Sequence, residues 1–233
     1  TDAPVEATEA PAEPTAAPVA AAEEAAEAVT VRLAALTGPT AMGMAKIFSD
    51  ADAGTAANDY EYALYGAADA PRSRYARLCE EYLRTFGDAP DALLISAPGR
   101  TELAGNHTDH QLGIVLCAAV TLDAAAAAAS AADNAVEIVS DGFGRVRVSL
   151  DDLAPRESEA GTTAALIRGV AAGFAAGGLR IGGWRACIHS LVPAGGGLSS
   201  SAAFEILTGA IFSALYNEGR VDALTLARIG QSA

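Results

Sequence analysis

The chain has 233 residues and carries 15 Lys and Arg against 29 Asp and Glu, which gives a formal net charge of −14. This excess of acid argues against proteins that bind nucleic acid through its phosphates, because such binding requires a basic surface. Cys79, Cys117 and Cys187 are far apart and odd in number, so they fit neither a zinc motif nor a disulfide framework. Reduced thiols of this kind indicate a cytoplasmic protein.

Residues 1–30 form a low-complexity stretch with four prolines, seven acidic residues and no cation. Such a composition cannot bury a core, so we expect a disordered tail over 1–30 and a weakly patterned extension over 31–70. The first residues lack the basic region of a signal peptide. Residues 114–132 are apolar enough to suggest a membrane span, but Asp123 lies within the run, and a charge there is costly. We therefore expect no membrane partner.

The first predicted elements are a helix and two strands. Residues 72–86 carry apolar side chains at helical spacing and predict a helix. The apolar run 92–97 predicts a short strand that ends at Pro98. Residues 114–120 predict a second strand, although the alanines that follow at 124–129 favour a helix by local propensity.

Strands and helices continue to the end of the chain. Two strands are expected around a Gly-rich turn, followed by a helix, a strand and two helices: residues 137–140, 146–150, 163–176, 185–191, 200–217 and 221–232. Strands and helices that are mixed without strict alternation favour an α+β fold.

The most distinctive segment is PAGGGLSSSAA at 193–203, where three glycines follow a predicted strand and three serines open a predicted helix. Glycines let a backbone approach a ligand closely, and a helix N-terminus offers unpaired N–H groups to an anion. The segment therefore predicts a site for nucleotide phosphates. It is not a Walker A loop, because no lysine follows the glycines. The alternative is a flexible turn with a serine cap.

A second polar segment, SAPGRTELAGNHTDHQLGIV at 96–115, crowds an arginine, two histidines and an aspartate between predicted strands. Carboxylate and imidazole groups suit the hydroxyls of a polyol, and Arg100 can balance phosphate charge. Two alternatives stay open. One is a metal site at His107, Asp109 and His110, although its ligand count falls short. The other is a polar loop whose side chains satisfy backbone groups.

Together the two segments resemble the signatures of the galactokinase branch of the GHMP small-molecule kinases. The signature G-R-x-N-L-I-G-E-H-T-D-Y-x-x-G-x-V-L-P stands here as GRTELAGNHTDHQLGIVLC at 99–117, and P-x-x-x-G-L-S-S-S-A stands at 193–202. The resemblance implies that 71–233 is an α+β GHMP kinase N-terminal domain, similar to the second domain of a ribosomal small-subunit protein. A ferredoxin-like C-terminal domain would be missing. It also implies that 115–129 is one long strand.

The resemblance implies roles for individual residues. Arg100 would stabilise the transferring phosphoryl group, Ser201 would help to hold Mg²⁺, and Ser140 would lie near the nucleotide. The implied sugar-binding residues are Asn106, His107, Thr108 and Asp109, and the implied ATP-phosphate residues are Gly195, Gly196, Gly197, Leu198, Ser199, Ser200 and Ser201.

The implied activity is ATP- and Mg²⁺-dependent phosphorylation of D-galactose to galactose 1-phosphate in galactose catabolism, by an enzyme that is monomeric at full length. A related sugar kinase and a non-catalytic sugar or nucleotide sensor are the alternatives. Among the positions that depart from the signature, three bear on its roles: Asn106 stands for Glu, His110 for Tyr and Cys117 for Pro. The family's catalytic aspartate and an acidic Mg²⁺ ligand would follow Ala233, so we expect the 233 residues alone to be inactive.

Overall fold

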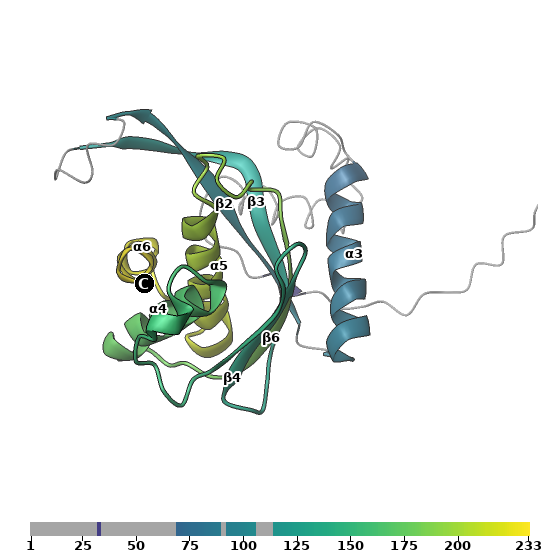
Figure 1. Ribbon diagram of the computed structural model, residues 1–233. Coiled ribbons are helices and arrows are strands. Elements are labelled where there is room, and N and C mark those ends of the chain that lie inside the picture. The colour runs from purple at the N-terminus through teal and green to yellow at the C-terminus, as the bar shows by residue number, and fades with distance from the viewer. Residues whose placement is uncertain (1–31, 34–68, 90–91, 106–113) are drawn as a thin grey trace, which may run out of the picture.

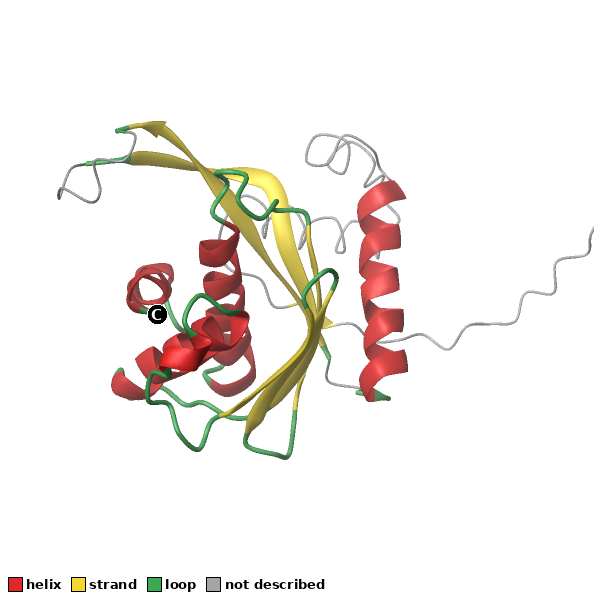
Figure 2. Ribbon diagram, viewed as in Figure 1, coloured by secondary structure: helices red, strands yellow, loops and turns green. Residues whose placement is uncertain are grey.

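The computed structural model describes residues 32–33, 69–89, 92–105 and 114–233. They form a six-stranded mixed sheet with one helix on one face and three on the other, as Figures 1 and 2 show. The elements are β1 (Arg32–Leu33), α3 (Asp69–Phe86), β2 (Leu93–Ala104), β3 (Leu116–Ser130), β4 (Ala135–Ser140), β5 (Gly144–Ser149), the 3₁₀ turn η2 (Glu157–Glu159), α4 (Thr163–Ala176), β6 (Trp184–Ser190), α5 (Ser200–Tyr216) and α6 (Ala223–Ser232). The expected α+β class is confirmed, whereas the predicted tail and extension lie almost wholly outside the described residues.

The strand order is β1-β2-β3-β6-β4-β5. β3 pairs antiparallel with both β2 and β6, and β6 pairs in parallel with β4. A parallel pair needs a crossover, and here the chain leaves β5 and returns to β6 through α4. This crossover places α4 beside α5 and α6 on one face, while α3 covers the other (Figure 1).

The alanine run of β3 is a strand, as the resemblance predicted and local propensity did not. Residues 123–129 are all buried, and the alanines alternate between the two cores. Ala124, Ala126 and Ala128 pack in the cluster under α4 to α6, and Ala125, Ala127 and Ala129 pack under α3. Pairing on both edges and burial on both faces outweigh an intrinsic helix preference of at most about 1 kcal/mol per residue.

β2 is longer than predicted. The expected end at Pro98 is wrong, because the strand continues to Ala104. Pro98 pairs with Asp123, and the ladder shifts its register between Pro98 and Arg100. Such an irregularity accommodates a residue that has no N–H to donate. The extension carries Arg100 along a β2–β3 ribbon that reaches beyond the rest of the sheet (Figure 1).

A buried polar cluster around Asp123 holds α3 against the sheet. The fully buried carboxylate accepts hydrogen bonds from Arg74 Nη1 at 2.5 Å, Ser96 Oγ at 2.5 Å and Tyr75 Oη at 3.3 Å. Arg74 also donates to the backbone oxygen of His189 at 2.8 Å. The pairing compensates the buried charge. The cluster joins α3, β2, β3 and β6. It lies where β2 and β6 approach the loop of residues 193–199, called the Gly-rich loop below.

The helices on the other face lie where the sequence predicted them. α4 covers the predicted residues 163–176, and α5 ends one residue earlier than predicted. Asp222 caps α6, because its Oδ1 accepts the N–H groups of Leu224 and Thr225 at 3.0 Å. In the part of the chain that is described, no helix is both long and apolar enough to cross a membrane.

Candidate functional site

The loop between β6 and α5 has an unusual backbone that suits a close approach by an anion. Gly195 and Gly197 have φ angles of +71° and +74°, which residues with a Cβ seldom adopt. The N–H of Gly196 donates to the oxygen of Pro193 at 3.3 Å and closes the turn. At two of the three glycines, therefore, the conformation itself requires the residue type.

The start of α5 is not capped by a side chain. Ser199 occupies the N-cap position with φ of +55°, and its side chain makes no capping hydrogen bond. A helix whose first N–H groups lack such a partner can offer them, and its partial positive charge, to an anion. This geometry does not support the alternative of a serine-capped turn.

A cavity of about 270 Å³ lies beside this loop. Three of the serines singled out from the sequence, Ser140, Ser200 and Ser201, line it together although they come from β4 and α5. The rest of the lining is hydroxyl-bearing or apolar: Ala124, Ile138, Phe143, Gly161, Thr162, Thr163, Leu166, Ile188, Ser190, Val192, Ala194 and Phe204. Within the described residues, the cavity is thus lined without any titratable side chain.

Arg100 is tied to the Gly-rich loop through its backbone. Its N–H donates to the oxygen of Leu198 at 3.1 Å. A Cβ on the preceding Gly99 would lie 2.9 Å from the same oxygen, so glycine permits this approach. The guanidinium contacts Glu102 at 3.1 Å and Cys117 Sγ at 3.6 Å. The hydrogen bond with Glu102 raises the pKa of Arg100, which therefore stays cationic.

The predicted sugar-binding residues Asn106, His107, Thr108 and Asp109, with His110, lie outside the described residues. The structure does place the two ends of their segment. A Cβ on Gly105 would come within 2.4 Å of the oxygen of Ile114, so these two residues are in close contact. The described residues that flank this segment therefore lie together at the end of the β2–β3 ribbon that also carries Arg100.

The third histidine belongs to the opposite face of the sheet. His189 is buried, and its Nε2 lies 2.7 Å from Glu81 Oε2 on α3 and 3.5 Å from Asp141 Oδ2. Ligand atoms of these three residues lie within 4.8 Å of one another. The short contact with Glu81 serves as a further tie between α3 and β6, on the face away from the cavity.

Sequence reasoning missed the part of the cavity wall that α4 and its preceding turn contribute. It is formed by Gly161, Thr162 and Thr163 at the start of α4, together with Phe143 and Leu166. The pattern of Thr162 before an apolar helical run does predict a cap, and Thr162 Oγ1 accepts the N–H of Ala165 at 3.4 Å. Nothing local in the sequence places this cap beside Ser200 and Ser201.

Two family models match the chain. The galactokinase galactose-binding signature matches residues 80–130, and the GHMP kinases N terminal domain matches residues 162–233. The galactokinase of Lactococcus lactis subsp. lactis is 30% identical over 158 residues, which is 66% of this chain and 39% of that protein. The galactokinase of Bacillus subtilis is 34% identical over 156 residues, 65% of this chain and 39% of that protein. The chain thus spans about two-fifths of the length of these curated relatives.

Solved structures also match this chain. The crystal structure of Lactococcus lactis galactokinase complexed with galactose matches with a TM-score of 0.62 and 30% identity, over 68% of this chain and 41% of that one. Mevalonate kinase from Methanococcus jannaschii matches with a TM-score of 0.50 and 15% identity, over 60% of this chain and 45% of that one. The second likeness concerns the fold alone.

Proposed function

Because this chain belongs to the GHMP kinases and its relatives within them are galactokinases, we propose that it supplies the sugar- and nucleotide-binding residues of an ATP-dependent galactose kinase. The γ-phosphoryl group of ATP would pass to the anomeric hydroxyl of D-galactose, giving galactose 1-phosphate and ADP. The observation that carries this proposal is the Gly-rich loop, with its positive-φ glycines and uncapped helix beside the cavity.

The cavity and loop suit the two ends of a nucleotide. The phosphates would meet the N–H groups of residues 195–201, and the base would enter the apolar part of the cavity between Phe143, Leu166 and Phe204. Arg100 carries a permanent positive charge and is tied to the loop at Leu198. In phosphoryl transfer the protein mainly positions the groups and stabilises charge, which is what these residues can do.

The residues at the cavity fit a bound Mg²⁺. This ion keeps several waters and phosphate oxygens and takes few protein ligands, and when bound it would neutralise phosphate charge. Ser201 presents a hydroxyl oxygen at the cavity and would be its protein ligand here. The cavity lining has no carboxylate or imidazole among the described residues to take the proton of a sugar hydroxyl. We therefore expect residues 1–233 by themselves to bind ATP without measurable turnover.

A second candidate is a non-catalytic sensor of sugar or nucleotide, which Asn106 in place of the signature's Glu favours. A phosphotransfer assay on the full-length gene product separates the two. We expect transfer from labelled ATP to D-galactose in preference to glucose, galacturonate and galactosamine. Binding of both ligands without transfer would establish the sensor, and preference for another sugar would establish a related sugar kinase.

The nucleotide site is tested by a pair of glycine variants. Gly197→Val forces a β-branched residue to a φ of +74°, and Gly178→Val does the same at +71° at the end of α4, away from the cavity. Strain of about 1–2 kcal/mol applies to both. Only Gly197→Val should weaken ATP binding in calorimetry, by about tenfold. Unchanged ATP affinity in a folded Gly197→Val protein would contradict the phosphate-loop assignment.

A further inference from the structure

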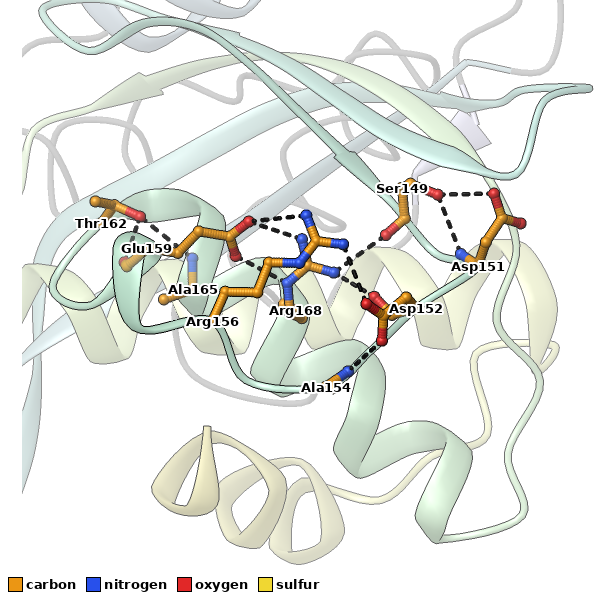
Figure 3. Close-up of polar contacts among 9 residues, drawn as sticks. All are labelled: Ser149, Asp151, Asp152, Ala154, Arg156, Glu159, Thr162, Ala165 and Arg168. Atoms are coloured by element: carbon orange, nitrogen blue, oxygen red, sulfur yellow. Dashed lines mark hydrogen bonds and ion pairs between the residues drawn. The ribbon is translucent and has the colours of Figure 1, made fainter.

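Arg168 lies buried on the second turn of α4, and each of its three guanidinium nitrogens donates at least one hydrogen bond (Figure 3). Nε and Nη2 donate to the two carboxylate oxygens of Glu159, both at 2.8 Å. Nη1 donates to the backbone oxygens of Ser149, at 3.4 Å, and of Asp152. A two-point guanidinium–carboxylate contact defines both distance and orientation. Arg168 therefore anchors the whole connection from β5 to α4.

Glu159 connects Arg168 to the cavity wall. Its backbone oxygen accepts the N–H of Thr162 at 3.0 Å and the hydroxyl of Thr162 at 2.6 Å. Thr162 is the N-cap of α4, and it lines the cavity together with Gly161, Thr163 and the serines of α5. One chain of contacts thus runs from Arg168 through Glu159 to the cavity wall at residues 161–163.

An arginine near a predicted phosphate site invites the alternative that it binds phosphate. The geometry argues against this role, since Arg168 is not part of the cavity lining and each guanidinium nitrogen already donates to Glu159 or to a backbone oxygen. The hydrogen bonds from Arg168 hold the pKa of Glu159 below its usual range, so both partners are charged at neutral pH. The pair can therefore act on a ligand only through the wall that it holds.

We propose that Arg168 is a positioning residue for the nucleotide: through Glu159 it sets the wall formed by residues 161–163 and so determines the affinity for ATP, without touching it. The inference rests on the proposed function, because it takes the occupant of the cavity to be ATP. It concerns the nucleotide alone, since the segment that resembles the sugar site is reached through β2 and β3 and not through α4.

The test compares Arg168→Lys, Arg168→Ala and Glu159→Gln in the full-length protein by calorimetry with ATP and, separately, with galactose. Lysine keeps the charge but cannot make the two-point contact. We expect the Kd for ATP to rise roughly tenfold in Arg168→Lys and Glu159→Gln and further in Arg168→Ala, as for loss of one charged hydrogen bond. The Kd for galactose should stay unchanged, and kcat at saturating ATP should be retained.

A double variant and a control pair complete the design. The double variant, Arg168→Lys with Glu159→Gln, should bind ATP no more weakly than the worse single variant. The reason is that the two substitutions break the same contact. As controls, Arg147→Lys and Glu137→Gln alter a group of ion pairs on the α3 side of the β4–β5 hairpin, in which Glu137 contacts Arg145 at 2.5 Å and Arg147 at 3.5 Å, and both should leave ATP affinity unchanged. A purely structural role for Arg168 would lower the melting temperature and leave ATP affinity intact, or weaken both ligands equally. Either result overturns the positioning role, whereas a wild-type protein that binds no ATP overturns the proposed function itself.

Discussion

The environment of single side chains separates the three thiols. Cys117 is exposed on β3 beside the Arg100 guanidinium, whereas Cys187 on β6 is fully buried under α3. Burial raises the pKa of Cys187 to about 11. Burial also raises the pKa of Cys79, which is partly exposed on α3. Since thiolates are the reactive form, the raised pKa values of Cys79 and Cys187 make these two thiols less reactive, and the exposure of Cys117 makes it the accessible thiol.

We expect iodoacetamide at pH 8 to alkylate Cys117 first and to reach Cys187 only when the protein unfolds. Mass spectrometry of digested samples, taken over time with and without urea, measures both rates. Because Cys117 contacts Arg100, alkylation of Cys117 should also slow phosphoryl transfer by the full-length protein. The Cys117→Ser variant should lose this sensitivity to iodoacetamide. Alkylation of Cys187 in the native protein at a similar rate would contradict the packing of α3 on β6.

Among the strands, β3 determines how closely the helices on the two faces of the sheet can pack. It lies at the centre of the sheet with helices on both faces, and its buried side chains from residue 124 to residue 129 are all alanine. Small side chains let α3 and α5 pack close to its backbone, while larger residues such as Phe174, Phe212 and Trp184 fill the surrounding core. An interior packed this densely has no room for added methylene groups.

Ala126→Leu should therefore destabilise the protein by about 1–3 kcal/mol, because the larger side chain overpacks the core under α5. The free energy of unfolding in urea measures the effect. Ala119→Leu is the matched control, since Ala119 is exposed on the same strand. Equal stability of the two variants would show that the core beside Ala126 is loosely packed.

For the whole molecule, the large excess of acid makes stability depend on the ionised state of its carboxylates. Hydrogen bonds in the folded state lower the pKa of Asp133, Asp151, Asp152, Glu159 and Asp222. A group whose pKa is lowered on folding contributes stability above its unfolded pKa and loses it as the pH falls through its folded pKa. The native state should therefore weaken on the acid side.

We expect the urea midpoint to be nearly constant between pH 7 and pH 5 and to fall steadily below the ordinary carboxyl values, which are 4.5 for Glu159 and 3.8 for Asp152. Glu159→Gln should lower the midpoint at pH 7 and reduce its dependence on pH in the acid range. A midpoint that rises as the pH falls below 4.5 would contradict these assignments.

The features that were predicted correctly from the residues depend on neighbours along the chain. Apolar spacing defined α3 to α6, and the glycines and serines of 193–201 identified the loop at the start of α5. Each of these signals is local, because a helix, a cap or a tight turn forms from residues a few positions apart. The resemblance then added the long strand of β3 and the family.

Contacts between distant segments account for the features that local patterns missed. Local propensity failed at 124–129 because pairing with β2 and β6 outweighs it, and the predicted stop at Pro98 failed because the β2–β3 ladder absorbs it with a register shift. The cavity wall at 161–163 and its anchor at Arg168 bring together β5, α4 and α5. Such contacts depend on the packing of elements that are far apart in sequence, and no spacing in the chain encodes their distance.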